Sequence, residues 1–269
     1  MIKSDCHMHS SFSSDSTEHM ETMINSAISK GLDYICFTEH MDLEFPEKYA
    51  LSFVFDVDEY MNCITGLSEK YRDRIRIFKG IEIGLKPDLS SRYDKILNSY
   101  DWDFVIGSTH LIDNIDPYYS EYWDNKDEKA CIYRYFECIY ENITACSNYD
   151  SLGHLDYVLR YSPSKGAGFL YNDFEDILNC ILQHIIQNNK SLEINSSGYK
   201  AGLSSPNPSE AIIKKYIELG GTAFTIGSDA HTAPHIAYEF NRLEKLLSSL
   251  GITFYNIYSC RKPKIKKIL

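Results

Sequence analysis

Two histidines, His7 and His9, lie one residue apart near the start of the chain, in the stretch DCHMHS. The apolar residues Met1 and Ile2 precede them and predict a strand, in which side chains two residues apart point the same way. Two adjacent imidazoles fill a core poorly but suit a metal ion. One pair is weak support, so the prediction of a metal site depends on partners elsewhere in the chain.

Further residues of metal-ligand type close other apolar runs. They are His40 in DYICFTEH, Glu82 in KGIEIG, His110 in DFVIGSTH, His154 in SLGHLD, Asp229 and His231 in TIGSDAH, and Asp15 shortly after the first run. Isolated structural histidines do not explain this recurrence, although we give that role to His19, His184 and His235, which lie on helical patterns. The set suits Zn, Fe or Mn and exceeds the needs of one ion, so it predicts a multinuclear site.

The elements that must position these residues are short apolar runs that alternate with longer helical patterns. Strands are expected within 2–8, 33–40, 74–84, 103–110, 151–156, 191–197 and 222–231. Helices are expected within 16–31, 57–72, 90–98, 127–147, 173–188, 208–219 and 236–249. Ser16 or Thr17 can cap the first helix, and Gly31 can end it.

The alternation of strands and helices predicts an α/β fold of parallel βαβ units. About seven units fit a closed barrel better than an open sheet, and the carboxyl ends of barrel strands meet on one face, where active sites form. There is no linker and no break in composition, so we expect a single domain over residues 1–269. All the ligand-type residues would then lie at one place.

Composition limits the possible functions. The formal net charge of −11 argues against a general nucleic-acid binder, and no run is long enough to span a membrane. The start of the chain lacks the pattern of a signal peptide, and the eight cysteines form no C-x-x-C pair. We therefore expect a cytoplasmic protein with reduced, mostly buried thiols. The basic tail RKPKIKKIL could bind an anionic partner, but we interpret it as a solvated terminus. The oligomeric state cannot be predicted from these features.

The motifs DCHMHS, TEH, GIEIG, GSTH, GHLD and GSDAH, in this order, resemble those of the PHP (polymerase and histidinol phosphatase) superfamily. VIGSTHLIDNIDPYY, YRYFE, GHLDYVLRY, EINSSGYK and RKPK further resemble its histidinol-phosphate phosphatase branch. The resemblance covers nearly the whole chain. It implies a distorted (β/α)7 barrel with two or three divalent transition-metal ions at the carboxyl ends of the strands.

The resemblance also implies which residues hold each ion. The first ion would be held by His7, His9, Glu82 and Asp229. Glu82 would bridge to a second ion, held also by His110 and His154. Asp15, His40 and His231 would hold a third. Position 15 is Asp where other branches of the superfamily often have His, and Asp is also an acceptable ligand.

Such a site suits the hydrolysis of a phosphate ester. A water between two cations loses a proton near neutral pH and becomes the nucleophile, while the cations neutralise charge on the phosphoryl group. Asp229 could also accept the proton of the nucleophile. Arg160, just beyond GHLDYVL, is expected to bind the phosphoryl oxygens. Lys200 ends SSGYK, where the histidinol phosphatases usually have Arg, so it would contact phosphate only as a point charge.

Two long segments, 41–56 and 111–126, follow the second and fourth strands and could shape a substrate pocket. The second segment interleaves acidic residues with aromatic residues: Asp113, Asp116, Glu121 and Asp124 with Tyr118, Tyr119, Tyr122 and Trp123. One of these carboxylates could pair with the ammonium group of histidinol phosphate, and an aromatic ring could hold its imidazole. Alternatively, the rings pack on the barrel, and Asp42 or Glu44 of the first segment reads the amine.

The leading interpretation is an enzyme that hydrolyses L-histidinol phosphate, a small-molecule ester, to L-histidinol and phosphate in histidine biosynthesis, with a metal-bridging hydroxide as nucleophile. The second is a PHP phosphoesterase for another small ester, such as a sugar phosphate or nucleotide. The third is a non-catalytic metal-binding module, against which the full ligand set argues. A polymerase proofreading module is disfavoured by the acidic charge and the lack of a polymerase region.

Overall fold

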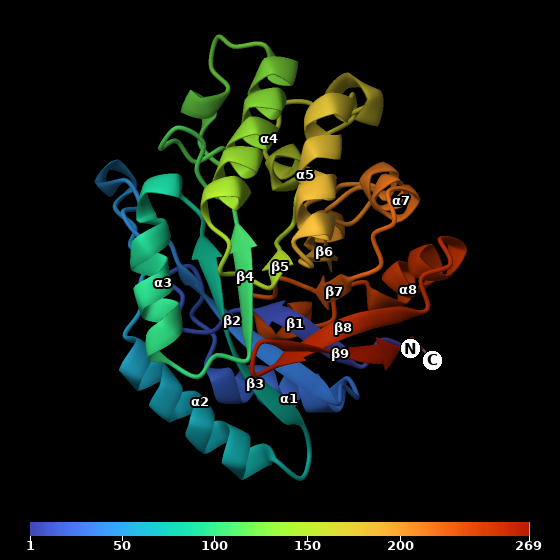
Figure 1. The fold of residues 1–269 in the computed structure, drawn as a ribbon. Coiled ribbons are helices and arrows are strands. Elements are labelled where there is room, and N and C mark those ends of the chain that lie inside the picture. Colours follow the sequence, from blue (N-terminus) through green and yellow to red (C-terminus); the bar gives the residue numbers. More distant parts are fainter. Residues whose placement is uncertain (269) are drawn as a thin grey trace.

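The apolar runs form a sheet of seven parallel strands in a computed structural model that describes residues 1–268. The strands are β1 (Ser4–Met8), β2 (Tyr34–Met41), β3 (Arg76–Gly84), β4 (Phe104–Ser108), β5 (Ser151–Leu152), β6 (Ser191–Asn195) and β7 (Phe224–Gly227). Each lies within a range expected from the sequence, except that β2 extends one residue beyond its range, to Met41. Neighbours in the chain are neighbours in the sheet, from β1 to β7 (Figure 1).

The sheet curls until its first and last strands meet. The amide of Asp229 donates to the carbonyl of His7 at 2.8 Å, and the amide of His9 donates to the carbonyl of Ala230 at 2.8 Å. Met8 and Ala230 form a parallel bridge. These contacts join the segment after β7 to β1, which confirms a nearly closed, distorted (β/α)7 barrel.

Helices connect successive strands and cover the outside of the barrel (Figure 1). They are α1 (Met20–Ser29), α2 (Val57–Tyr71), α3 (Ser90–Ser99), α4 (Glu128–Ala145), α5 (Glu175–Gln187), α6 (Ser197–Lys200), α7 (Glu210–Glu218) and α8 (Phe240–Ser249). All but the four-residue α6 were expected. Each longer helix buries one apolar stripe against the sheet; in α1 this stripe is Met20, Met23, Ile24 and Ala27.

The start of α1 corrects one expectation. Neither Ser16 nor Thr17 caps the helix, because it begins later, with His19 at its N-cap and no side-chain cap bond. The Ser16 hydroxyl instead donates to the carbonyl of His231 at 2.8 Å. Gly31 does follow the helix end, with a positive φ of 73° that glycine adopts without strain.

The basic C-terminal segment, which we expected to be a solvated terminus, forms a strand. An antiparallel hairpin joins β8 (Phe254–Ser259) to β9 (Lys262–Lys267) and lies beside β7 (Figure 1). The lysines of β9 are nonetheless largely exposed. The alternation of Lys with Pro263 and Ile265 carried too little hydrophobic signal for a strand to be predicted there.

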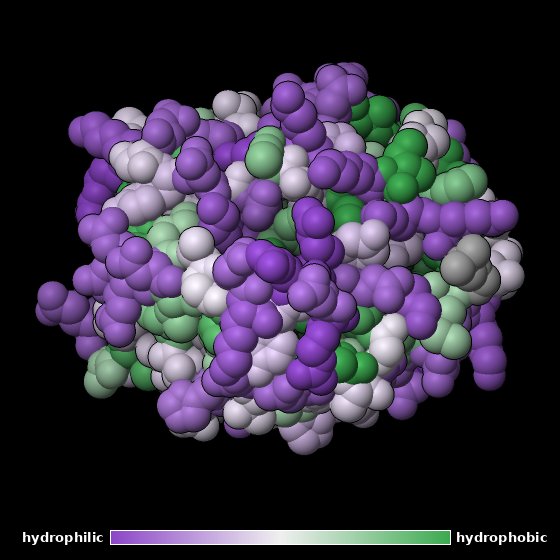
Figure 2. All heavy atoms as spheres, turned by 90° about the horizontal axis from the view of Figure 1, so that it is seen from below, coloured by the Kyte–Doolittle hydropathy of each residue, from purple (hydrophilic) through white to green (hydrophobic). Residues whose placement is uncertain are grey.

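The core consists of the apolar side chains between the barrel and its helices, together with the packed barrel interior. Five of the eight free cysteines are buried, in agreement with the expectation of mostly buried thiols. On the face seen in Figure 2, hydrophilic side chains predominate and hydrophobic ones stand in separate groups. None of the helices in residues 1–268 is long and apolar enough to cross a membrane.

Candidate metal centre and its pocket

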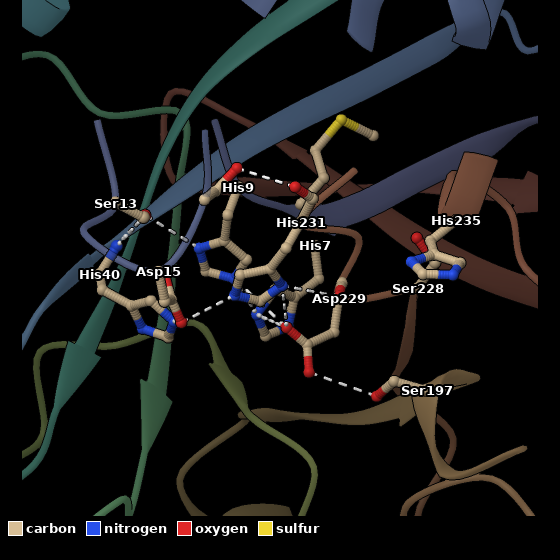
Figure 3. A network of polar contacts seen from close by, with 12 residues as sticks. His7, His9, Ser13, Asp15, His40, Ser197, Ser228, Asp229, His231 and His235 are labelled. Atoms are coloured by element: carbon tan, nitrogen blue, oxygen red, sulfur yellow. Dashed lines mark hydrogen bonds and ion pairs between the residues drawn. The ribbon is translucent and has the colours of Figure 1, made fainter. Parts of the chain in front are cut away.

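The ends of the strands bring together all nine residues that the sequence singled out as ligands. His7, His40 and Glu82 lie within strands, and the others lie in the segments that follow strands. Those others are His9 and Asp15 after β1, His110 after β4, His154 after β5, and Asp229 and His231 after β7. Figure 3 shows the imidazoles of His7, His9, His40 and His231 gathered around Asp15 and Asp229. His235, which we had assigned to a structural role, stands apart from them.

Glu82 lies at the centre of the cluster, fully buried. Its Oε2 atom lies 3.2 Å from His7 Nε2 and 3.1 Å from His40 Nδ1. Its Oε1 atom lies 2.9 Å from His154 Nε2 and 3.3 Å from His110 Nε2. The two oxygens of one carboxylate therefore face two different groups of imidazoles, as a bridging ligand would.

Two aspartates complete the cluster on either side of His231. Asp229 Oδ1 lies 3.4 Å from His9 Nε2 and 3.6 Å from His231 Nδ1. Asp15 Oδ2 lies 3.1 Å from His231 Nε2 and 3.5 Å from His40 Nε2. Among the residues described, overlapping groups of nitrogen and oxygen atoms could each hold an ion; they include His7, His9 and Glu82, and Glu82, His110 and His154.

The buried polar atoms of the cluster fit divalent cations. His154 Nδ1 is buried and has no hydrogen-bond partner in the structure. Glu82 Oε2 and His40 Nδ1 lie 3.1 Å apart, but neither makes a hydrogen bond of acceptable geometry. Unpaired buried polar atoms are costly, and natural proteins rarely leave them so. A carboxylate oxygen surrounded by imidazole nitrogens is the donor set that Zn, Fe and Mn bind.

The electrostatics of the cluster stabilise a charged carboxylate and shift the pKa values of the histidines in both directions. Burial opposes charge on Glu82, but the imidazoles of His7, His110 and His40 hold the pKa of its carboxyl well below the usual value. Burial, together with His40 and His231, lowers the pKa of His9 well below that of free histidine. Burial opposes charge on His7, His40 and His110 as well, but nearby carboxylates raise the pKa of His7 and His40 well above that of free histidine and the pKa of His110 to about 10. Binding of metal ions at these three imidazoles would therefore release protons.

Backbone geometry explains how β7 approaches the cluster. A Cβ atom at Gly227 would lie 2.3 Å from the Cβ of His7 and 2.8 Å from Glu193 Oε1. Only glycine therefore lets β7 pass this close to β1. Two residues later Asp229 has a φ of 53°, a left-handed conformation that is uncommon for residues other than glycine. In this conformation, shortly after β7 ends, the carboxylate of Asp229 lies beside His9.

Two buried carboxylates orient the histidines, and sequence reasoning gave neither of them this role. Glu193 Oε1 lies 2.6 Å from His7 Nδ1, and its Oε2 accepts from the amide of His154 at 2.8 Å. Asp42 Oδ1 lies 2.7 Å from His110 Nδ1. Such carboxylates fix the ring orientation and the tautomer of a ligand histidine. An acidic residue within the apolar strand SLEIN was the signal that could have identified Glu193.

A pocket of about 400 Å³ opens above the cluster. Asp15, His40, His110, His154, Asp229 and His231 form part of its lining. The predicted phosphate-binding residues Arg160 and Lys200 also line it. Lys200 Nζ lies 3.4 Å from the carbonyl of Asp229, so it stands at the rim beside the cluster. The pocket thus presents cations beside a metal-type site, an arrangement that suits a phosphate ester.

The loop after β4 turns only one of its four acidic residues toward the pocket. Asp116 is part of the pocket lining. Asp113 pairs with Arg134 at 2.8 Å, Glu121 pairs with Lys48 at 2.6 Å, and Asp124 accepts from Ser120 at 3.4 Å.

Aromatic residues from the loop after β2 and from the segment after β5 line the pocket. Phe45 and Phe53 of the loop after β2 line it, as do Tyr157 and Tyr161. The rings of the loop after β4 instead pack on other side chains: Tyr119 stacks on Tyr49 with ring centroids 4.1 Å apart. The aromatic lining therefore does not come from the loop after β4, which the sequence had suggested. Glu44, one of the alternative amine readers, pairs with Arg92 and does not line the pocket.

Comparison with known proteins gives a consistent result. Residues 5–197 match the PHP domain model. A histidinol-phosphatase from Lactococcus lactis is 32% identical over 268 residues, which are 99% of this chain and 97% of that protein. A histidinol-phosphatase from Bacillus subtilis is 25% identical over 265 residues, covering 89% of this chain and 97% of that one.

A solved structure shares the whole architecture. It is the histidinol phosphate phosphatase from Lactococcus lactis, complexed with zinc, L-histidinol and phosphate. The TM-score is 0.89 at 30% identity, and the match covers 97% of this chain and 98% of the other. Fold, motifs and sequence identity over nearly the full length agree, and the chain belongs to the PHP domain family.

Proposed function

We propose that this protein is a metal-dependent phosphatase that hydrolyses L-histidinol phosphate to L-histidinol and phosphate, within a single domain formed by residues 1–269. The observation that carries the proposal is the pocket itself. Six of the nine residues of metal-ligand type line it, and its walls hold cations and a carboxylate. A relative 30% identical over nearly the same length is known with zinc, histidinol and phosphate.

The cluster would hold two or three divalent ions. His7, His9, Glu82 and Asp229 would bind the first, Glu82, His110 and His154 the second, and Asp15, His40 and His231 the third. The division of the Glu82 oxygens between two groups of imidazoles supports its bridging role. Such ions, when bound, activate water and act as Lewis acids toward a phosphoryl group.

The protein's own residues would hold the phosphate end of the substrate. Arg160 offers a planar donor group suited to pairs of phosphoryl oxygens, and Lys200 adds a point charge. The Arg160 guanidinium lies beside Asp229, with Nη1 2.9 Å from Oδ2. Because Asp229 Oδ2 already accepts this bond, the carboxylate is better suited to hold an ion and orient Arg160 than to take up a proton.

The other end of the pocket would select the leaving group. Asp116 is the carboxylate of its loop that reaches the pocket, and we propose that it pairs with the substrate ammonium. Phe45 and Phe53 offer aromatic surface for the imidazole. Asp42, the alternative amine reader, also lines the pocket, but it is buried and its Oδ1 is engaged with His110. We therefore propose Asp116 rather than Asp42 for that role.

A panel of phosphate esters tests the proposal. Protein loaded separately with Zn, Mn or Fe is assayed with L-histidinol phosphate, a sugar phosphate, a nucleoside monophosphate and an uncharged aryl phosphate. We expect the highest kcat/KM for histidinol phosphate with at least one of the metals. A higher value for the sugar phosphate or nucleotide would instead indicate a PHP phosphoesterase of other specificity. The absence of turnover with every ester would support a non-catalytic metal-binding module.

A further inference from the structure

Arg160 is held in place from three sides, although it has to face a ligand. The residue is buried, with 7% of its surface exposed. Its Nη1 donates to Asp229 at 2.9 Å, its Nη2 donates to Ser197, and its Nε donates to Asn207 Oδ1 at 2.8 Å. The guanidinium also lies over the ring of Tyr157, 4.9 Å from the centroid. Each terminal nitrogen keeps a second hydrogen that these contacts do not use.

Asn207 differs from the other two partners because it does not line the pocket. It is fully buried, and its backbone pairs with that of Asn195 in both directions, at 2.7 and 2.9 Å. Its Nδ2 donates to Asp156 Oδ1 at 2.5 Å, and the other oxygen of Asp156 accepts from the amide of Ser209 at 2.7 Å. Asp156 can only accept when ionised, so it fixes which end of the Asn207 amide faces Arg160.

We propose that Asn207, oriented by Asp156, is a positioning residue for Arg160 and sets the grip of the enzyme on the phosphoryl group. The chain Asp156–Asn207–Arg160 leads from a buried carboxylate to the pocket wall. A side chain as long as arginine has many rotamers, and fixing Nε removes most of this freedom before the substrate arrives. A fixed guanidinium plane matters because Arg binds phosphate through a planar pair of donors. This inference rests on the phosphate-binding role proposed above for Arg160.

The test is the binding of inorganic phosphate to the metal-loaded protein, measured by calorimetry. Asn207→Ala should weaken phosphate binding roughly 5- to 20-fold, which is less than the loss of a whole charge-assisted hydrogen bond because Arg160 itself stays in place. In an Arg160→Ala background the same change should have an effect of less than about two-fold, since coupled residues are non-additive. A merely structural role for Asn207 would weaken binding equally in both backgrounds and would overturn the proposal.

Asp156→Asn is a second variant of nearly unchanged shape. The new amide at position 156 has one oxygen and one NH2 group, so it can no longer accept from both Asn207 and the amide of Ser209. If its NH2 group faces Asn207, the Asn207 amide must turn over. The NH2 group of Asn207 would then face Arg160, which can only donate. We expect weaker phosphate binding here too, again dependent on Arg160. Normal phosphate binding in both Asn207→Ala and Asp156→Asn would refute the positioning role. Metal content is measured in every variant, and a loss of bound metal that matches the loss of phosphate binding would also refute it.

Asn148→Ala is a matched control on the far side of the fold. Asn148 makes the same kind of bridge, donating to Asp94 at 3.0 Å and accepting from Arg261 at 3.2 Å. Its removal should leave phosphate binding unchanged. The outcomes also separate the two proposals: if Arg160→Ala itself leaves phosphate binding intact, the proposed role of Arg160 fails. If only the Asn207 and Asp156 variants bind normally, the positioning role alone fails.

Discussion

At the scale of single residues, one buried carboxylate organises the candidate site. Glu82 reaches two groups of imidazoles through its two oxygens, and its Oε1 also accepts from the Ser108 hydroxyl at 2.6 Å. A charge buried this deeply is stable only with compensating partners. Its removal should therefore affect every ion that it touches.

Glu82→Ala should lower the bound metal by at least one ion per chain, because it removes a ligand shared by two proposed ions. Metal analysis after purification from metal-replete cultures measures the effect. Glu137→Ala, on the outward side of α4, is the control and should keep the full metal complement. An unchanged metal content in Glu82→Ala would show that this carboxylate is not a ligand.

Arg160→Ala should reduce kcat/KM for histidinol phosphate by about 1.5–3 kcal/mol, which is roughly 10- to 150-fold, because a charge-assisted bond to the phosphoryl group is lost. Steady-state kinetics measure this. Arg242→Ala is a suitable control, since the exposed Arg242 stacks on Tyr199 and contacts the carbonyl of Ser204. Wild-type kinetics in Arg160→Ala would remove that residue from the site.

At the scale of elements, most of the strands and helices could be predicted from local patterns. Apolar runs such as DYICFTEH and DFVIGSTH are long enough to mark buried strands, and each helix carries one apolar stripe. The β8–β9 hairpin could not be predicted, because KPKIKK is held as a strand by pairing with β8 rather than by its own hydrophobicity. The predicted cap of α1 was wrong, because the hydroxyl of Ser16 donates to the carbonyl of His231 instead of capping the helix.

The same limit applies to the candidate site. Nine ligand-type residues could be located from sequence, since each follows or ends an apolar run. The role of Glu193 could not, because its partner His7 is distant in the chain and meets it only when the barrel closes. Which carboxylate of the loop after β4 reaches the pocket also depended on loop geometry, and Asp116 emerged only from the structure.

Asp116→Asn should raise KM for histidinol phosphate roughly ten-fold, because an ammonium–carboxylate pair is lost, while an uncharged aryl phosphate is hydrolysed nearly as before. Asp113→Asn, in the same loop but paired with Arg134 outside the pocket, is the matched control. Equal effects of Asp116→Asn on both substrates would mean that Asp116 does not recognise the amine.

The approach of β7 to β1 gives a prediction that is independent of substrate. Gly227→Ala should destabilise the fold by about 1–3 kcal/mol, because the added methyl group overlaps His7. Gly66→Ala, in the middle of α2 with open space around it, should instead stabilise by about 0.5–1 kcal/mol. Chemical denaturation measures both, and a neutral Gly227→Ala would contradict the tight packing described here.

At the scale of the whole molecule, an acidic chain builds a pocket for an anionic ester. The formal net charge is −11. The pocket lining combines the cations Arg160, Lys165 and Lys200 with four aspartates, Asp15, Asp42, Asp116 and Asp229. Bound cations would add further positive charge beneath them, and local charge rather than net charge decides what a site binds. Barrel, ligand cluster and loops thus serve one site, at the carboxyl ends of the strands where barrels of this kind place their chemistry.

The most direct test is phosphate release from L-histidinol phosphate by protein whose metal content has been counted in the same sample. We predict at least two transition-metal ions per chain, loss of turnover when a chelator removes them, and recovery when metal is restored. Full turnover by metal-free protein would contradict the central claim, and so would failure of the metal-loaded protein to release phosphate from this ester.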